Sequence, residues 1–133
     1  MRRSCSTGAV AVLLCALVVG CTPGTETSDA KNAGAEKTCG LDSLPPQAAT
    51  TVDLIESGGP FPYPRNDGVV FGNFEGLLPK HERGYYHEYT VPTPGMHHRG
   101  QRRIVTGGQP LNNPAEYFYT GDHYQSFCQI GDM

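Results

Sequence analysis

Residues 43–59 read SLPPQAATTVDLIESGG and predict the principal helix of the chain. Proline in the first turn and a glycine pair after the last turn are typical of a helix that runs through Gln47–Ser57. Ala48, Val52 and Ile55 follow one another at i, i+4 and i+7, so this helix has one apolar stripe that is expected to face the core. No other segment of comparable length has helical periodicity, and the rest is expected to form strands and loops.

Five short segments after the helix are bounded by Gly, Pro, Asn or Asp, which is typical of strands. They are Gly68–Asn73, Tyr85–Val91, Arg102–Thr106, Tyr117–Thr120 and Phe127–Ile130. Consecutive short strands favour an antiparallel meander, and a single helix that covers one face makes the fold class α+β. We therefore predict one N-terminal helix packed on a small antiparallel β-sheet.

Composition limits the size and the charge of this domain. The chain has 133 residues, with 13 Asp and Glu against 10 Lys and Arg, and its formal net charge is −3. A chain of this length has room for one small domain, so a multidomain enzyme is excluded. An acidic chain does not bind a polyanion through its whole surface, so any nucleic acid must be bound at a local basic site.

The first 20 residues have the parts of an export signal, with Arg2 and Arg3 before an apolar run at Ala9–Val19. That run is shorter than the ~20 residues that a membrane-spanning helix needs. Small residues just before Cys21 resemble a lipobox, which predicts lipidation of Cys21 and attachment to the membrane through that lipid. Residues 21–38 then form a flexible tether, and residues 39–133 form the domain. An ordinary secretory signal, which would release a soluble protein, is the alternative.

Two cysteines remain once Cys5 and Cys15 leave with the signal and Cys21 carries lipid. In an exported domain, Cys39 and Cys128 most simply form one disulfide that closes almost the whole domain. A zinc site competes poorly, because two cysteines without CxxC spacing supply only half of a structural site.

A carboxylate stands in the middle of the predicted strand Tyr85–Val91. Alternation places Tyr86, Glu88 and Thr90 on one side of that strand. A mid-strand glutamate is disfavoured unless it is solvated, paired or functional. Glu88 is therefore a candidate functional residue.

The densest positive charge lies at residues 97–103, HHRGQRR. Guanidinium groups suit phosphate because their planar fork donates two parallel hydrogen bonds and stays charged. Alternation sends Arg102 and Arg103 to opposite faces, and we expect Arg103 to share the face of Glu88. The alternative is a solvated basic hairpin without a ligand.

His123 lies in a predicted tight loop at residues 119–124, YTGDHY. A loop histidine is by default a surface residue. One Glu, one His and several Arg from different strands are nevertheless the groups that cleavage of an RNA phosphodiester requires. A carboxylate takes the 2′-hydroxyl proton, an imidazolium protonates the departing oxygen, and guanidinium groups stabilise the phosphoryl charge. The nucleophile belongs to the substrate, so this chemistry needs no metal or other cofactor.

The segment Val69–Glu75, VVFGNFE, runs from a strand into a loop. Glu75 could be one more exposed carboxylate. A carboxylate is also a natural partner for the N1 and N2 donors of guanine, and Phe71 or Phe74 could stack on the base.

Seven segments, taken in order, carry a resemblance to a known family. They are LPP (Leu44–Pro46), GPFPYP (Gly59–Pro64), DGVVFGN (Asp67–Asn73), YYHEYTV (Tyr85–Val91), TPG (Thr93–Gly95), RGQRRIV (Arg99–Val105) and YTGDHY (Tyr119–Tyr124). They closely resemble the secreted bacterial guanyl-specific ribonucleases of the ribonuclease Sa group, which are relatives of barnase. The similarity covers about Cys39 to Ile130, and it implies the same fold class.

The resemblance implies a catalytic role for four residues. Glu88 matches the general base, His123 the general acid, and Arg99 and Arg103 the phosphate-binding arginines. The family cleaves single-stranded RNA after guanosine through a 2′,3′-cyclic phosphate, which it hydrolyses to a 3′-phosphate, and it uses no metal cofactor. Many members are blocked by a barstar-like protein inhibitor, and we expect the protein to be a monomer.

The resemblance also implies a substrate-binding set. Glu75 matches the carboxylate that binds guanine, and Tyr124 matches a tyrosine at the phosphate. The rest of the expected set is Val69, Phe71, Asn73, Phe74 and Tyr86.

Two features depart from the family pattern. Relatives have a polar or basic side chain where Phe74 stands, so the base is expected to stack differently on that side. The second cysteine of close relatives lies nearer the C-terminus than Cys128 does.

A second function class is a membrane-tethered module of the same fold that binds a nucleotide or a protein without catalysis. Such a module would lack Glu88, His123 or the arginines, and all are present.

Overall fold

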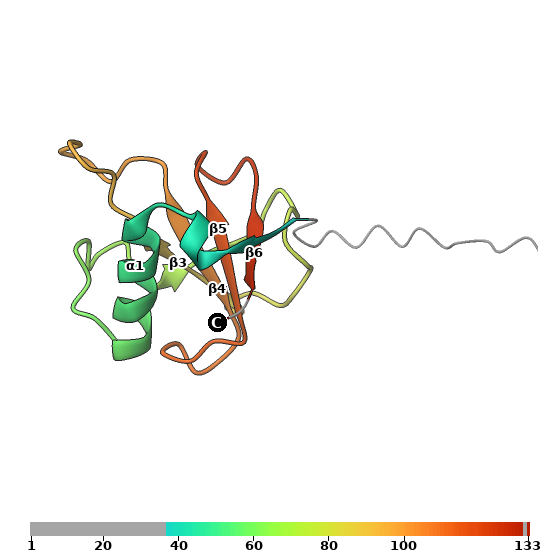
Figure 1. Cartoon of the computed structure of the whole chain (residues 1–133). Helices are drawn as coiled ribbons and strands as arrows, with labels where there is room; N and C mark the ends of the chain where they lie inside the picture. The colour runs from blue at the N-terminus through green and yellow to red at the C-terminus, as the bar shows by residue number, and fades with distance from the viewer. Residues whose placement is uncertain (1–36, 132) are drawn as a thin grey trace, which may run out of the picture.

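One helix packs across one face of a six-stranded sheet in the computed structural model, which describes residues 37–131 and residue 133 (Figure 1). In chain order the elements are β1 (Thr38–Gly40), the 3₁₀ turn η1 (Leu41–Ser43), α1 (Pro46–Ser57), β2 (Val69–Val70), β3 (Tyr86–Thr90), β4 (Arg103–Gly107), β5 (Glu116–Thr120) and β6 (Cys128–Gly131). The strand order is β1-β6-β5-β4-β3-β2, and every neighbouring pair is antiparallel except β1 with β6. The predicted α+β class is confirmed.

Helix α1 has the ends that its sequence predicts. Pro46 occupies its first turn, and Gly58 ends it in the left-handed conformation at φ 78°. The amide of Gly59 donates to the carbonyl of Leu54 at 2.8 Å, so the last turn is closed by a backbone bond. Its predicted apolar stripe is buried.

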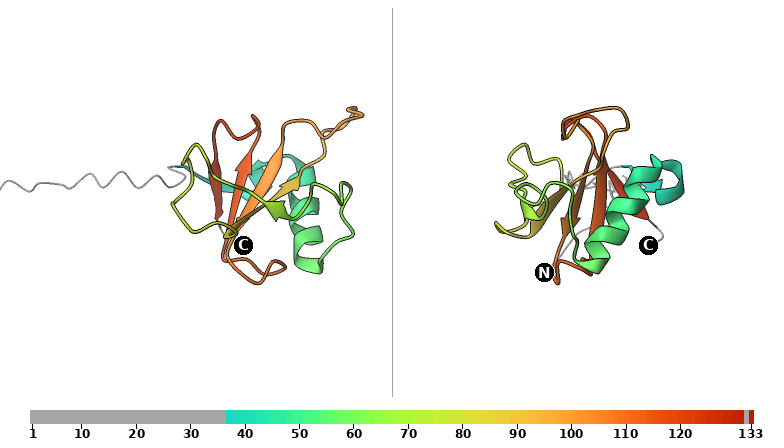
Figure 2. Two further views of the ribbon diagram at one scale, coloured as in Figure 1. Left: turned by 180° about the vertical axis from the view of Figure 1, so that it is seen from behind. Right: turned by 90° about the vertical axis from the view of Figure 1, so that its left-hand side faces the viewer.

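The sheet has an apolar cluster on each face. On the α1 face, the helix stripe packs against Tyr89, Ile104 and other buried side chains. On the opposite face, Tyr86, Val105 and Phe118 form a second cluster, which is covered by the loop between β2 and β3 (Figure 2). Strand β3 therefore alternates between two packed faces, and Glu88 lies on the face opposite the helix.

Two strand predictions need correction. Only Val69 and Val70 of the segment Gly68–Asn73 form a regular strand, although the amides of Gly68 and Phe71 also donate to carbonyls of β3, and the chain then turns away into the loop that follows. Thr38, which the sequence analysis places in the tether, belongs to β1, which adds to the sheet as a parallel edge strand. A three-residue strand has too few positions for alternation to reveal it. The expected signal at 1–20, the lipidated Cys21 and the tether up to residue 36 lie outside the described residues.

Helix α1 and the rest of the described chain offer no helix with the length and hydropathy that crossing a membrane requires.

Cys39 on β1 and Cys128 on β6 form the predicted disulfide, with an S–S distance of 2.04 Å and a sequence separation of 89 residues. We predict that replacing both cysteines by alanine lowers the free energy of unfolding by up to about 4.5 kcal/mol, because the unfolded chain loses a long loop constraint. Urea unfolding of the double variant and of the reduced wild type should give the same lowered midpoint. An unchanged midpoint in both would contradict this role for the disulfide.

Candidate active site

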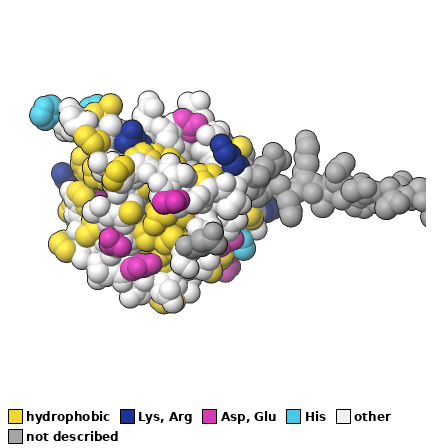
Figure 3. All heavy atoms as spheres, viewed as in Figure 1, with side chains coloured by type: hydrophobic (Ala, Val, Ile, Leu, Met, Phe, Trp, Pro, Cys, Tyr) yellow, Lys and Arg dark blue, Asp and Glu magenta, His cyan; other side chains and the backbone are white. Residues whose placement is uncertain are grey.

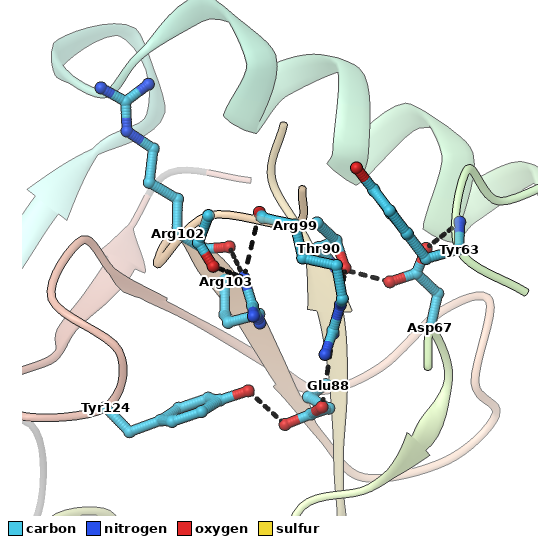
Figure 4. Close-up of polar contacts among 9 residues, drawn as sticks. Tyr63, Asp67, Glu88, Thr90, Arg99, Arg102, Arg103 and Tyr124 are labelled. Carbon is cyan, nitrogen blue, oxygen red and sulfur yellow. Dashed lines mark hydrogen bonds and ion pairs between the residues drawn. The ribbon is translucent and has the colours of Figure 1, made fainter. Parts of the chain in front are cut away.

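Glu88 is the centre of a polar cluster on the sheet face opposite the helix. Its side chain is 15% exposed and lies between two donors (Figure 4). Arg99 approaches one carboxylate oxygen with Nη2 to Oε1 at 3.5 Å, and the hydroxyl of Tyr124 donates a short hydrogen bond to Oε2. The carboxylate is therefore paired on one side with a cation and on the other with a neutral donor.

Arg99 comes from the loop between β3 and β4. Its Nε donates to the hydroxyl oxygen of Thr90 at 2.9 Å, which aims the guanidinium along β3 toward Glu88. Thr90 and Glu88 share one face because they are two positions apart on the strand. Figure 3 shows histidine side chains at the tip of the same projecting loop, where His97 and His98 are exposed.

Arg103 lies on the Glu88 face, and Arg102 points to the other face (Figure 4). The side chain of Arg103 is 3% exposed, and its Nη1 donates to the carbonyls of Arg102 at 2.8 Å and Gly100 at 3.0 Å. Its buried Nε has no acceptor among the described residues. A fixed guanidinium with an unpaired buried N–H is suited to an anionic ligand.

Tyr124 contacts Glu88, Arg103 and Phe71, which lies in the loop after β2. Burial, and then the neighbouring Glu88, raises the pKa of its hydroxyl above the usual value, so the hydroxyl stays protonated and donates. The Arg103 guanidinium lies 6.0 Å from the centre of its ring, and Phe71 stacks on it at 5.0 Å.

His123 is presented by the tight loop between β5 and β6. Its φ of 58° and the φ of 71° at Tyr124 are left-handed, and its amide donates to the carbonyl of Gln101 at 3.1 Å. The imidazole is exposed, lies 4.8 Å from the ring of Tyr124, and makes no hydrogen bond with the described residues. His123 thus stands beside Tyr124, the same tyrosine whose hydroxyl donates to Glu88.

Asp122 holds this loop together. Its Oδ1 accepts from the Thr120 hydroxyl at 2.9 Å and from the amides of Gln125 and Ser126, and its Oδ2 accepts from the Ser126 hydroxyl. Burial tends to raise the pKa of this carboxyl, but the hydrogen bonds outweigh burial and hold the pKa below its usual value. The charged carboxylate therefore stabilises the loop that carries His123.

We predict that this stabilisation depends on pH. The folded pKa lies below the unfolded one, so the contribution is complete above the unfolded value and is lost as pH falls through the folded value. The difference in unfolding free energy between the wild type and Asp122→Asn should be largest near neutral pH and should shrink below about pH 4. Thermal unfolding at several pH values measures it, with the exposed Asp53→Asn as control. An equal difference at all pH values would contradict the prediction.

The loop after β2 is shaped by Asn73. Its side chain donates to the carbonyl of Leu78 at 2.9 Å and accepts from the amide of Leu78 at 3.1 Å, and its own φ is 49°. Glu75 is exposed at the tip of this loop, with its carboxylate in contact with no described hydrogen-bond donor. The Asn73 side chain is thus engaged within the loop, whereas the Glu75 side chain is exposed.

The other predicted binding residues differ in exposure. Phe74 is 92% exposed, and its ring lies so close to Gly72 that an added Cβ there would overlap it. Val69 is 42% exposed and pairs with Glu88 in the register of β2 and β3. Tyr86 is 3% exposed, and its hydroxyl donates to the carbonyl of Pro79, so the structure places it mainly in the core.

Three supporting residues were missed as members of the site. Thr90 holds Arg99, Asp122 shapes the His123 loop, and Phe127 lies edge-on to Phe71 at 6.0 Å. Alternation already placed Thr90 beside Glu88, and the position of Asp122 in a Gly-Asp turn was a possible signal.

The cluster can accept a proton and bind an anion in one place. Glu88 is an acceptor beside Arg99, and Arg103 brings an unpaired donor to the same face. Within residues 37–131 and residue 133, no three His, Cys, Asp or Glu side chains gather as a metal site.

The sequence matches the family described as ribonuclease over residues 26–131. It is 60% identical over 88 residues to guanyl-specific ribonuclease Sa3 of Kitasatospora aureofaciens, which covers 66% of this chain and 59% of that protein. It is 58% identical to guanyl-specific ribonuclease St of Saccharopolyspora erythraea over 65% of this chain and 80% of that protein. Guanyl-specific ribonuclease Sa of K. aureofaciens is 56% identical over 68% and 88%.

Solved structures of ribonuclease Sa2 share the fold. In its complexes with mononucleotides, Sa2 is 46% identical, with a TM-score of 0.65 over 72% of this chain and 94% of that chain. In its complex with guanosine-2′-cyclophosphate the identity is 48% and the TM-score is 0.63, over 71% of this chain and 94% of that chain.

Proposed function

Because this chain belongs to the ribonuclease family, in the Sa group of guanyl-specific ribonucleases, we propose that it is an endoribonuclease that cleaves single-stranded RNA after guanosine. The observation that carries the proposal is the Glu88 carboxylate between Arg99 and Tyr124, with the unpaired Nε of Arg103 on the same face. Sa2, a relative in the same group, binds guanosine-2′-cyclophosphate.

In the proposed reaction, Glu88 takes the proton of the guanosine 2′-hydroxyl, and the resulting oxygen attacks the adjacent phosphorus. His123 protonates the departing 5′-oxygen, which releases the downstream RNA and leaves a 2′,3′-cyclic phosphate. In a second step His123 takes a proton from water, whose oxygen attacks phosphorus. The bond from phosphorus to the 2′-oxygen breaks, Glu88 returns a proton to that oxygen, and a 3′-phosphate remains. The exposed position of His123 beside Tyr124 supports this role, because an imidazole that donates to a substrate oxygen needs no partner in the protein.

The arginines are proposed to stabilise charge on the phosphoryl oxygens. Arg103 is held by backbone carbonyls and stays rigid, so its donors need no reorganisation during the reaction. Arg99 is anchored by Thr90 and can interact with the phosphate while it remains close to Glu88. Tyr124 donates to Glu88 and is placed to approach the same phosphate.

Guanine is proposed to bind at residues 71–75. Glu75 would accept from N1–H and from the 2-amino group, a pair of donors that adenine and the pyrimidines lack. Phe71 and Phe74 provide aromatic surface within this loop, and Val69 lies just before it.

We also propose that residues 1–20 direct export and that a lipid on Cys21 anchors the protein, so that RNA is cleaved outside the cytoplasm.

One assay tests the proposed function. The purified protein is incubated with single-stranded RNA in EDTA, and the new 3′ ends are mapped and their phosphates identified. We expect ends at guanosine that carry a cyclic phosphate first and a 3′-phosphate later. Glu88→Gln protein, purified in the same way, controls for contaminating ribonuclease. Ends spread over all four bases, or cleavage that EDTA abolishes, would overturn the proposal.

A further inference from the structure

A hollow opens on the proposed guanine loop, whose residues 71–74 form part of one wall. It has a volume of about 440 Å³ and lies between residues 70–74 on one side and residues 80–83 on the other, with Tyr86 at its base. Glu75, Glu88, Arg99, Arg103 and Tyr124 do not line it. The hollow therefore shares a wall with the proposed guanine loop, but it contains none of the proposed catalytic residues.

The lining combines positive charge with aromatic surface. Lys80 and Arg83 are exposed there, against a single carboxylate, Glu82. His81 stacks on Tyr85 at 3.7 Å with an angle of 11° between the rings, and it meets the ring of Tyr86 edge-on at 5.7 Å. Flat aromatic surface together with cations is the combination that binds single-stranded nucleic acid.

The position of the hollow along β3 indicates which nucleotide would occupy it. Tyr86 lies at the start of β3, Glu88 in its middle, and Thr90, which holds Arg99 and is in register with Arg103, at its end. The scissile phosphate on the 3′ side of guanosine is proposed to bind at the Thr90 end. The hollow at the opposite end then lies on the 5′ side.

We propose that this hollow is a subsite for the nucleotide on the 5′ side of guanosine. Its base stacks beside His81 and Phe74, and Lys80 and Arg83 bind the phosphate that joins it to guanosine. This inference rests on the proposed ribonuclease function, and it adds a second nucleotide to the substrate that the protein recognises.

The test compares three substrates, GpC, ApGpC and GpCpA. For the wild type we expect kcat/KM on ApGpC to exceed that on GpC by about tenfold, since stacking of one base contributes that much. Lys80 and Arg83 are proposed to hold the phosphate that positions the base for stacking, so a variant with both Lys80→Ala and Arg83→Ala should lose this advantage, and the ratio of ApGpC to GpC should fall to about one. The control variant carries Lys37→Ala and Arg65→Ala, which removes two exposed charges outside the hollow, and it should keep the wild-type ratio.

Three results would overturn the subsite. The first is an equal kcat/KM of the wild type on ApGpC and GpC, and the second is a higher kcat/KM on ApGpC that persists in the Lys80 and Arg83 variant. The third is a variant whose kcat/KM falls on GpCpA alone. If the wild type does not cleave GpC, the proposed function fails, and the subsite is then tested by a binding measurement that does not depend on cleavage. The probe is then d(ApGpC), which lacks the 2′-hydroxyl nucleophile, titrated while the amide NMR signals of residues 80–83 are observed. Shifts at those residues that dGpC does not cause support the subsite, and their absence overturns it.

Discussion

Glu88→Gln should lower kcat for RNA cleavage by a factor of about 10² to 10⁴ while the protein stays folded. The amide cannot take the 2′-hydroxyl proton, yet it has the shape of the carboxylate and still accepts one hydrogen bond. Its two partners, Arg99 and Tyr124, are both only partly buried. Initial rates on GpC measure the effect, and thermal unfolding by circular dichroism verifies the fold.

His123→Gln is the matched variant for the proposed general acid, which protonates the departing 5′-oxygen. Its imidazole is exposed and has no hydrogen bond to lose among the described residues, so we expect little change in stability. Loss of the general acid should lower kcat by a comparable factor. A variant of either residue that cleaves GpC at nearly the wild-type rate would remove that residue from the mechanism.

Glu75→Gln should abolish the preference for guanosine. A carboxylate that accepts two hydrogen bonds from guanine contributes about 1.5 to 3 kcal/mol for each bond, so kcat/KM on GpC should fall by about 10² or more. Cleavage of ApC, which offers no such donor pair, should change little. Glu75 is exposed and makes no contact that the fold requires, so the effect should be on substrate choice and not on stability.

Glu56→Gln is the control for the loss of one negative charge. Glu56 is an exposed carboxylate on α1, on the opposite side of the sheet from the candidate site. It should leave the ratio of GpC to ApC cleavage unchanged. If Glu75→Gln retains the wild-type ratio, guanine is recognised by other groups, of which the backbone amides of the same loop are the first candidates.

The strand around Glu88 shows which side-chain positions can be predicted from alternation along the sequence. Alternation correctly separates Tyr89 and Val91, which lie in the cluster on the α1 face, from Tyr86 on the site face. It is wrong for Tyr85, which precedes β3 and packs against the same cluster as Tyr86. The same rule separates Arg102 from Arg103 but leaves open which of them lies with Glu88. The pairing of Thr90 with Arg103 settles that question, because it depends on the register between two strands.

The aromatic contacts of the site were beyond sequence reasoning. Phe71, Tyr124 and Phe127 meet although their segments are about 50 residues apart, and their contacts arise when the loop after β2 folds back over the sheet. The short hydrogen bond from Tyr124 to Glu88 also joins distant segments, the loop between β5 and β6 and the strand β3. The hollow beside residues 80–83 likewise exists only because two parts of one long loop face each other.

Local patterns in the chain were enough to determine the helix, the strands β3 to β6 within one or two residues, and the face to which Glu88 belongs. These features follow from backbone geometry, proline and glycine preferences, and side-chain periodicity, which act over a few residues. The parallel strand β1, the choice of Arg103 and the partners of Glu88 were decided by the tertiary structure alone. Each depends on segments distant in the chain, which only strand register and packing bring together.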